Sequence, residues 1–514
     1  MVKVFGVAVQ GIQATTITIE VNTARGIKFF LVGLADAAVK ESHERIVSAM
    51  SYNGYHFPSS QIIVNMAPAD IRKEGAAYDL PLAIGIMGAS GMLENVEKLS
   101  RFMIVGELGL DGSVQPVRGA LPMAIRAMKD GFEGLIVPSA NAREAGVVKN
   151  LKVYGADNLA QVIAFFNGDD EALTRTAVDA RREFFSAPAE YDYDFADVKG
   201  QENVKRALEI AASGGHNIAM IGPPGSGKSM MAKCLPSILP PLSLSESLET
   251  TQIHSVAGLL SRGDTLITQR PFRCPHHSIS SVALVGGGQH AQPGEISLAH
   301  NGVLYTDELP EFARSSLEVL RQPLEDRKIT ISRSRYSVEY PCSVMLVASM
   351  NPCPCGYYNH PTHDCVCTPT QVQKYLNRIS GPMLDRIDLH IEILPVSFVE
   401  LSHAAKGESS AAIRERVVYA RKIQEERFRE FPLVHCNAQM TSRLIARFAA
   451  PTPEGIQLLK QAMEKLSLSA RAYDRILKVA RTIADLDGSQ RVEAPHIAEA
   501  ISYRMLDREN WATR

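Results

Sequence analysis

Residues 217–235, NIAMIGPPGSGKSMMAKCL, constrain the fold more than any other stretch of the chain. The apolar run 218–221 predicts a buried strand, and a helical pattern follows the loop Gly-x-x-x-x-Gly-Lys-Ser. Glycines in such a loop let backbone N–H groups surround phosphates. This order predicts a P-loop in an α/β domain, with Lys228 reaching the β- and γ-phosphates and Ser229 the Mg²⁺. The expected nucleotide-binding residues are Gly222, Pro223, Pro224, Gly225, Ser226, Gly227, Lys228 and Ser229.

Two further apolar runs end in polar residues that suit the same site. Residues 303–306 predict a buried strand ending in Asp307-Glu308. Asp307 would hold Mg²⁺ through water and so belongs to the nucleotide-binding set, whereas Glu308 would polarise the attacking water. Another apolar strand ends at Asn351, which would contact the attacking water or the γ-phosphate. The alternative for Asn351 is a turn-forming residue before a proline.

The pattern along the chain divides it into four parts. Residues 1–166 alternate β-rich runs with helical stretches and predict a mixed α/β domain. The charged, weakly periodic segment 167–193 predicts a linker. Residues 194–397 form a second α/β block, and 398–514 are helical. The expected strands are 17–21, 28–32, 61–65, 101–105 and 134–137, and the expected helices are 36–50, 121–129, 410–428, 441–448, 453–465, 470–485 and 494–504.

Composition limits the environment and the partners. The net charge of −2 excludes a globally basic protein, so any contact with nucleic acid must come from a local basic surface. The first residues lack the pattern of a signal peptide, and the apolar run 80–93 is too short to span a bilayer. Eight cysteines in a chain of 514 residues without an export signal favour a reducing, cytoplasmic location. We therefore expect no membrane partner.

These motifs make the chain resemble an AAA+ ATPase of the magnesium-chelatase and MCM branch. Two later stretches add to this resemblance, RISGPMLDRIDLHIEI and LSLSARAYDRIL. Within the branch, the bacterial ComM (YifB) family is identified by RCPHHSISSVALVGGGQHAQPGEISLAHNGVLYTDELPEF and by NPCPCG, and the resemblance covers nearly the whole chain. It implies a three-layer α/β/α P-loop core with a C-terminal helical lid, a hexameric ring, and ATP sites between subunits.

The resemblance also implies roles for two arginines and one segment. Arg386, in LDRID, would be the arginine finger that reaches a neighbour's γ-phosphate. Arg471, in SAR, would be the sensor-2 arginine of the lid. Residues 194–212 resemble the segment that holds the adenine. Without the resemblance, either arginine could be an ordinary surface ion-pair residue.

The first domain resembles the proteolytic domain of Lon, a ribosomal S5-like fold. The similar stretches are NMAPADIRKEGAAYDLPLAIGIM and VGELGLDGSVQPVRGALPMAI. Ala77 stands where the resemblance expects the nucleophilic serine, and Pro122 stands where it expects the activating lysine. Neither side chain can do that chemistry. The domain is therefore expected to be a non-catalytic tier that helps assemble the ring. Arg72, Lys73 and Arg118 could contribute to a path for DNA, the alternative being ordinary solvated residues.

Basic residues between the acidic pair and Asn351 predict a DNA contact. Residues 328–331 and 335–340 predict two short strands joined near residues 333–334, and the resemblance implies that this hairpin points into the central pore. The hairpin cations are Arg327, Lys328, Arg333 and Arg335, of which Lys328, Arg333 and Arg335 are the expected DNA-binding residues. A ring of such clusters would attract a phosphate backbone. The alternative is a solvated edge hairpin. Residues 269–295 are expected to form a long loop facing the pore, with His276/His277 contacting DNA rather than metal.

Four of the cysteines lie within NPCPCGYYNHPTHDCVCTP, residues 351–369. Cys353, Cys355, Cys365 and Cys367 suit a structural zinc site, with His360 or His363 as substitutes. The one-residue gaps are tighter than the usual two to four, so reduced thiols packed in a turn remain the alternative.

Three functions compete on these residues. The first is an ATP-dependent DNA translocase or helicase, which the resemblance links to branch migration in homologous recombination during natural transformation. Its cofactors would be ATP and Mg²⁺, and its partners single-stranded or branched DNA and other copies of the chain. The second is a metal-insertion motor of the magnesium-chelatase kind, and the third is an ATP-switched scaffold. An ATP-dependent protease is excluded by Ala77 and Pro122.

Overall fold

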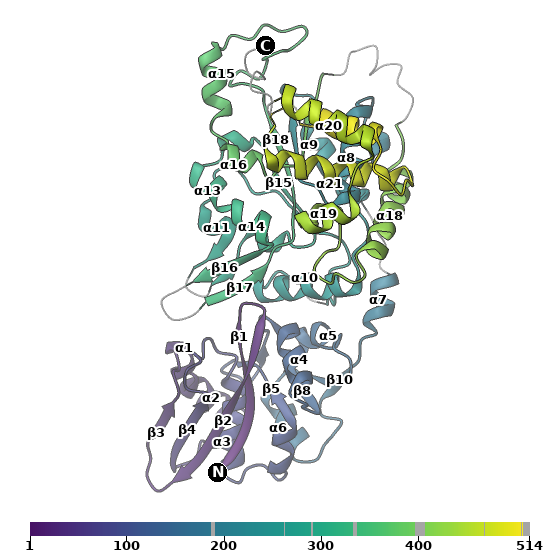
Figure 1. The fold of residues 1–514 in the computed structure, drawn as a ribbon. Helices are drawn as coiled ribbons and strands as arrows, with labels where there is room; N and C mark the ends of the chain where they lie inside the picture. The colour runs from purple at the N-terminus through teal and green to yellow at the C-terminus, as the bar shows by residue number, and fades with distance from the viewer. Residues whose placement is uncertain are drawn as a thin grey trace.

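The computed structural model describes residues 1–186, 191–261, 263–288, 291–332, 337–395, 407–466, 468–504 and 506. Figure 1 shows two parts in contact, an N-terminal part (purple to blue) and a larger part (teal to yellow). Each part is built on one main β-sheet. Among the helices within these ranges, none is long and apolar enough to cross a membrane.

The N-terminal sheet has eight strands in the order β10-β9-β8-β5-β1-β2-β4-β3. Its centre is an antiparallel hairpin of β1 (Val2–Gln10) and β2 (Gln13–Ala24). The other strands are β3 (Phe29–Val32), β4 (Gln61–Ala67), β5 (Phe102–Ile104), β8 (Gly134–Pro138), β9 (Lys152–Ala156) and β10 (Thr174–Thr176). The five predicted strands correspond to β2, β3, β4, β5 and β8, whereas β1, β9 and β10 were missed.

The helices of this part are α1 (Ala37–Lys40), α2 (Ser42–Tyr52), α3 (Asp79–Ala89), α4 (Ala120–Lys129), α5 (Ala142–Ala145) and α6 (Leu159–Phe166). The single helix predicted over 36–50 is interrupted between α1 and α2. Ser42 Oγ donates to Val39 O at 2.6 Å, a local side-chain bond of the kind that competes with helix hydrogen bonds. Most of the apolar run 80–93 lies in α3, which packs in the core of this part.

The segment 167–193 contains two elements. β10 pairs antiparallel with β9 and extends the sheet, with Leu173 buried just before it. α7 (Ala180–Ser186) follows, and its Glu183 forms an ion pair with Arg143 at 2.8 Å and accepts a hydrogen bond from Thr265 at 2.5 Å. Glu183 therefore ties the N-terminal part to the larger one.

The larger sheet has five parallel strands in the order β12-β15-β18-β11-β19. They are β11 (Ile218–Ile221), β12 (Phe272–Arg273), β15 (Val303–Thr306), β18 (Met345–Met350) and β19 (Leu389–Glu392). Because β18 lies between β11 and β15, its tip stands between the P-loop and the acidic pair. The main helices around this sheet are α8 (Glu202–Gly214), α9 (Lys228–Cys234), α10 (Leu244–Ala257), α13 (Arg314–Val319), α14 (Arg321–Asp326), α15 (Pro369–Leu376) and α16 (Gly381–Leu384).

The predicted C-terminal helices are all present. They are α18 (Ser410–Arg427), α19 (Ser442–Phe448), α20 (Pro453–Lys465), α21 (Ala470–Leu486) and α22 (Ala494–Ser502). Their apolar faces share one core with the sheet, in which Ile218 and Met220 belong to the same buried cluster as Val417, Ile476 and Ile483. The helical region is therefore packed as a continuation of the sheet's core.

The other face of the sheet is covered by the predicted hairpin and by the segment before β15. The hairpin of β16 (Lys328–Ser332) and β17 (Ser337–Pro341) buries Ile329, Ile331, Val338 and Tyr340 against this face. Residues 269–295 do not form the long loop that was predicted. They contain β12, α11 (Ser281–Val285), β13 (Gly286–Gly287) and β14 (Gln292–Pro293), and Leu284 is buried in the same core.

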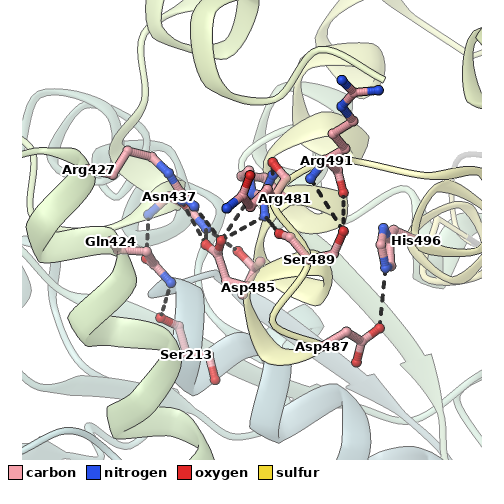
Figure 2. A network of polar contacts seen from close by, with 12 residues as sticks. Ser213, Gln424, Arg427, Asn437, Arg481, Asp485, Asp487, Ser489, Arg491 and His496 are labelled. Atoms are coloured by element: carbon pink, nitrogen blue, oxygen red, sulfur yellow. Dashed lines mark hydrogen bonds and ion pairs between the residues drawn. The ribbon is translucent and has the colours of Figure 1, made fainter. Parts of the chain in front are cut away.

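Figure 2 shows a buried polar network that joins the C-terminal helices to α8. Asp485 of α21 is fully buried and accepts hydrogen bonds from Arg427 at 2.8 Å, from Asn437 at 2.8 Å and from Arg481 at 3.1 Å. Gln424 of α18 donates to the Ser213 carbonyl of α8 at 3.1 Å. Burial lowers the pKa of the Arg481 guanidinium, and Asp485 opposes this shift. Asp485 is thus the counter-charge of two arginines.

Replacing Asp485 by alanine is expected to destabilise the larger part by about 3–5 kcal/mol, because Arg427 and Arg481 would remain buried without a counter-charge. Differential scanning calorimetry of the full chain measures this as a lower melting temperature. The matched control is Asp487→Ala, because Asp487 lies two residues away and is 48% exposed. This control should change the free energy of unfolding by less than about 1 kcal/mol. Equal effects of the two variants would contradict the role of the network.

Candidate nucleotide-binding site

The P-loop has the backbone conformation that its glycines permit. Gly225 and Gly227 have φ of 78° and 88°, values that side-chain-bearing residues rarely adopt. The N–H of Gly222 donates to Met350 O at 3.2 Å and thereby joins the loop to the end of β18. The loop and the tip of β18 therefore form one unit.

Lys228 lies inside this unit. Its Nζ donates to the carbonyls of Gly222 at 2.7 Å and Pro223 at 2.8 Å, and to Asn351 Oδ1 at 3.2 Å. Burial lowers the pKa of the Lys228 ammonium, and the nearby Asp307 and Glu308 oppose that shift. The ammonium thus stands between the P-loop and the tip of β18.

Asp307 is held by groups from β15, from β18 and from the P-loop helix α9. Its Oδ2 accepts from Ser229 Oγ at 3.0 Å, and its Oδ1 accepts from the N–H of Glu308 at 3.0 Å and from Ser349 Oγ. Tyr305 OH lies within hydrogen-bond distance of both serine hydroxyls, 3.2 Å from Ser229 Oγ and 3.0 Å from Ser349 Oγ, and its one proton is shared between them. Burial opposes ionisation of Asp307, but the hydrogen bonds from Ser349 and Ser229 prevail and lower its pKa. A carboxylate fixed beside Ser229 suits Mg²⁺, which prefers such oxygen ligands.

Glu308 projects away from this network. Its backbone is in the left-handed region at φ 53°, and its side chain is 53% exposed. Its Oε2 lies 3.4 Å from His277 Nδ1, and the His276 and His277 rings are in contact with centroids 4.0 Å apart. The sequence predicted DNA contact for this histidine pair and gave no indication that a carboxylate lies beside it. The strand order brings the segment after β12 beside the end of β15, where Glu308 lies.

Sequence reasoning missed two residues of the site, Tyr305 and Ser349, and it assigned His277 to DNA contact rather than to a position beside Glu308. Tyr305 and Ser349 had a detectable signal, because alternate residues of a strand point to the same face. Tyr305 lies two residues before Asp307, and Ser349 lies two residues before Asn351. His277 had no comparable signal, because its position depends on which strand neighbours β15.

The structure does not bring Arg386 or Arg471 to the P-loop of the same chain. Arg386 precedes β19, and the pairing of Ile218 with Leu389 places it at the opposite end of the strands from Gly222. Its guanidinium donates to Arg321 O at 2.9 Å and Pro382 O at 2.6 Å, and it forms an ion pair with Glu325. Arg471 is 3.4 Å from Asp385, the neighbour of Arg386. The two arginines therefore lie close to each other at the far end of the sheet.

The cysteine segment directly follows Asn351. The sulfur atoms of Cys353, Cys355, Cys365 and Cys367 all lie within 4.8 Å of one another. His360 is engaged elsewhere, because its Nδ1 accepts the N–H groups of Thr362 at 3.2 Å and His363 at 3.0 Å. The four sulfurs, and not the histidines, form the cluster.

A cavity lies where the Lon resemblance expects a protease active site. Ala77, Tyr78 and Arg118 line it on the N-terminal side, and Val338 and Tyr340 of the hairpin line it on the other. Pro122 is buried in α4. Of the suggested DNA-contacting residues, Lys73 is fully buried and donates to Pro68 O, so it cannot form a surface path. Arg72 forms an ion pair with Glu74 at 3.1 Å.

The hairpin cations occupy different environments. Lys328 is exposed and forms an ion pair with Glu339 on the facing strand at 3.0 Å. Arg333 and Arg335 lie outside the residues that the structure describes. Arg327 does not belong to this surface, because it lines a cavity with Asp388 and Arg475, and burial there lowers its pKa.

Comparison with known proteins agrees with this architecture. Three family profiles match, namely magnesium chelatase, subunit ChlI, over residues 194–401, subunit ChlI of Mg-chelatase over 19–141, and the ChlI C-terminal region over 407–504. Competence protein ComM of Haemophilus influenzae is 44% identical over 98% of this chain and 97% of its own length. YifB of Salmonella typhimurium is 44% identical over 98% of this chain and 96% of its own.

A shorter match is to Lon protease 2 of Bacillus subtilis, which is 28% identical over 28% of this chain and 27% of its own length. The full-length matches, the parallel five-stranded sheet and the P-loop identify the same architecture. The chain belongs to the ComM/YifB family of magnesium-chelatase-like AAA+ ATPases.

Proposed function

We propose that this protein hydrolyses ATP as a hexameric ring and uses the energy to translocate along DNA and unwind it. The observation that carries the proposal is the convergence of Lys228, Ser229, Asp307 and Asn351 at one edge of the sheet. The Haemophilus influenzae relative bears the name of a competence protein. We therefore propose branch migration in homologous recombination during natural transformation as the process that this activity serves.

The site residues divide the work of hydrolysis. The P-loop backbone and Lys228 bind the phosphates, and Ser229 and Asp307 hold Mg²⁺, which neutralises the charge that develops on the phosphate oxygens. Glu308 accepts the proton of the attacking water, and Asn351 orients that water or the γ-phosphate. The segment 194–212 holds the adenine. Glu308 suits its role because its side chain is exposed at this edge, whereas Asp307 is fixed by Ser229 and Ser349.

The remote arginines support a ring. Arg386 and Arg471 lie at the opposite end of the strands from the P-loop, so neither can contact the nucleotide of its own chain. A head-to-tail ring brings this end of one subunit toward the P-loop of the next. In such a ring Arg386 acts as the arginine finger and Arg471 as the sensor-2 arginine.

We propose that DNA passes along the hairpin of β16 and β17, with Lys328, Arg333 and Arg335 contacting its phosphates. Inward residues such as Ile329 and Ile331 anchor the hairpin to the core, while Lys328 faces outward. The ion pair of Lys328 with Glu339 is exposed, so a DNA phosphate can replace the carboxylate at small cost.

The triple variant Lys328→Ala, Arg333→Ala, Arg335→Ala is expected to weaken single-stranded DNA binding and to lower its salt slope by about 2, because each lost phosphate contact removes about 0.7 from the slope. Basal ATPase activity without DNA should be unchanged. Fluorescence anisotropy at several salt concentrations measures both quantities. The control is Arg429→Ala, an exposed arginine of the C-terminal region. Unaltered DNA affinity in the triple variant would overturn the hairpin assignment.

Two alternative functions make different predictions. A metal-insertion motor would hydrolyse ATP in response to a partner subunit and not to DNA, and a scaffold would bind ATP without sustained turnover. ATPase activity measured with and without single-stranded and forked DNA separates the three, and a strand-displacement assay on forked DNA tests unwinding directly. No stimulation by any DNA structure would overturn the proposed function.

A further inference from the structure

The four cysteine sulfur atoms have the spacing of the ligands of a metal site. The Sγ–Sγ distances are 3.3 Å between Cys353 and Cys355, 3.7 Å between Cys353 and Cys365, and 3.5 Å between Cys355 and Cys365. A tetrahedral zinc ion with Zn–S bonds of about 2.3 Å separates its sulfurs by about 3.8 Å. A disulfide would bring two of them to about 2.05 Å. The observed spacing fits zinc and does not fit a disulfide.

Backbone groups surround the sulfurs as they do around metal-bound thiolates. The N–H groups of Tyr357 and Val366 donate to Cys355, and the N–H of Cys367 donates to Cys365. Such hydrogen bonds orient ligands and stabilise their charge. They come from both Cys-x-Cys turns, so the two turns are already folded around a common centre.

The segment has little else to hold it in shape. Residues 351–368 contain no helix or strand. Its small apolar cluster consists of Cys353 and Val372 of α15, with a few partly buried neighbours that include the other three cysteines. A bound metal supplies the folding free energy that such a small core lacks.

The same segment touches the nucleotide site at two points. It begins at Asn351, which contacts Lys228. It also packs against the P-loop, because a Cβ on Gly356 would lie 2.6 Å from Pro224 Cδ. Gly356 has φ of 85°, so this close approach and the backbone conformation both require glycine. Pro224 of the P-loop therefore packs against the turn that carries Cys353 and Cys355.

We infer that Cys353, Cys355, Cys365 and Cys367 bind one zinc ion, which holds the turn at Gly356 against Pro224 and thereby keeps the P-loop in its nucleotide-binding conformation. The metal binding stands on the sulfur geometry alone, whereas its effect on nucleotide affinity rests on the proposed function. The zinc is structural, since all four ligands are cysteines and no position is left for water.

The first test is metal analysis of the full chain, purified without chelators. We expect about one zinc ion per subunit, and we expect the cobalt-substituted protein to have the absorption of a tetrahedral thiolate site. Cys355→Ser with Cys365→Ser should lose the metal. The control Cys274→Ser changes an exposed cysteine outside the cluster and should retain it. A chain without metal, in which all four thiols react freely, would overturn the zinc site.

The second test measures the effect of zinc on nucleotide affinity in the wild-type chain, so that the result does not depend on folding of the double variant. Removing zinc with a chelator should weaken binding of a fluorescent ATP analogue about tenfold, and zinc alone should restore it. Gly356→Ala should retain zinc but bind the analogue more weakly, because its Cβ would push Pro224 away. Unchanged nucleotide affinity after zinc removal would overturn the coupling. Zinc binding with no nucleotide binding in any state would instead overturn the proposed function.

Discussion

Replacing Glu308 by glutamine is expected to lower the rate of ATP hydrolysis by about 10²- to 10⁴-fold while leaving ATP binding intact. The amide cannot accept the proton of the attacking water. The groups that hold nucleotide and metal are independent of the Glu308 side chain, because Asp307 is fixed by Ser229, Ser349 and the backbone N–H of residue 308. The variant should consequently accumulate ATP-bound protein and remain on DNA. Steady-state phosphate release and filter binding of labelled DNA measure the two effects.

The control for this variant is Glu311→Gln. Glu311 lies three residues farther along and forms an ion pair with Arg378 at 2.7 Å, away from the P-loop. It should retain near wild-type turnover, because an exposed ion pair contributes little. If Glu308→Gln kept more than about a tenth of the wild-type rate, Glu308 could not be the general base.

Mixing two inactive variants is expected to restore ATPase activity. Lys228→Ala removes the ammonium that binds the phosphates, and Arg386→Ala removes the finger, whose loss is expected to cost about 10³-fold or more. A ring assembled from both contains interfaces in which an intact P-loop faces an intact Arg386. Random mixing at equal amounts gives about one quarter of such interfaces in a closed ring. ATPase activity should therefore rise well above that of either variant alone.

This result depends on the position of Arg386 at the end of the strands opposite the P-loop. Two controls accompany it. Mixing Lys228→Ala with Glu308→Gln should give no recovery, because both changes affect the same subunit's side of the interface. Sedimentation must confirm that the mixed rings assemble. Assembled mixed rings of Lys228→Ala and Arg386→Ala without recovered activity would exclude action between subunits.

The nucleotide site was largely predictable because its residues follow one rule. Each of its key residues ends or follows an apolar strand, and the carboxyl ends of parallel strands meet at the same edge of a sheet. This rule correctly predicted that one site contains Lys228, Ser229, Asp307 and Asn351. The C-terminal helices were also found within two residues, since their apolar periodicity is strong.

The errors arose where position depends on the order of strands or on burial. Lys73 and Arg327 are cations that were grouped with surface residues. Lys73 is buried and donates to Pro68 O, whereas Arg327 lines a cavity at the amino ends of the parallel strands. Residues 269–295 contain glycines and histidines typical of a loop, but Leu284 and Ala291 anchor them in the core. These helices and strands are two to five residues long, so they are too short for a hydrophobic period to be recognised in the sequence.

The sequence by itself determined the P-loop, the acidic pair, the strand that ends in Asn351, and the paired cysteines, because each depends on residue types at short, definite spacings. The tertiary structure alone decided which groups meet across long separations. It placed His277 beside Glu308, Gly356 against Pro224, and Arg386 away from the P-loop of its own chain. The physical reason is that strand order and side-chain packing, which no local pattern encodes, decide which ends of which elements come into contact.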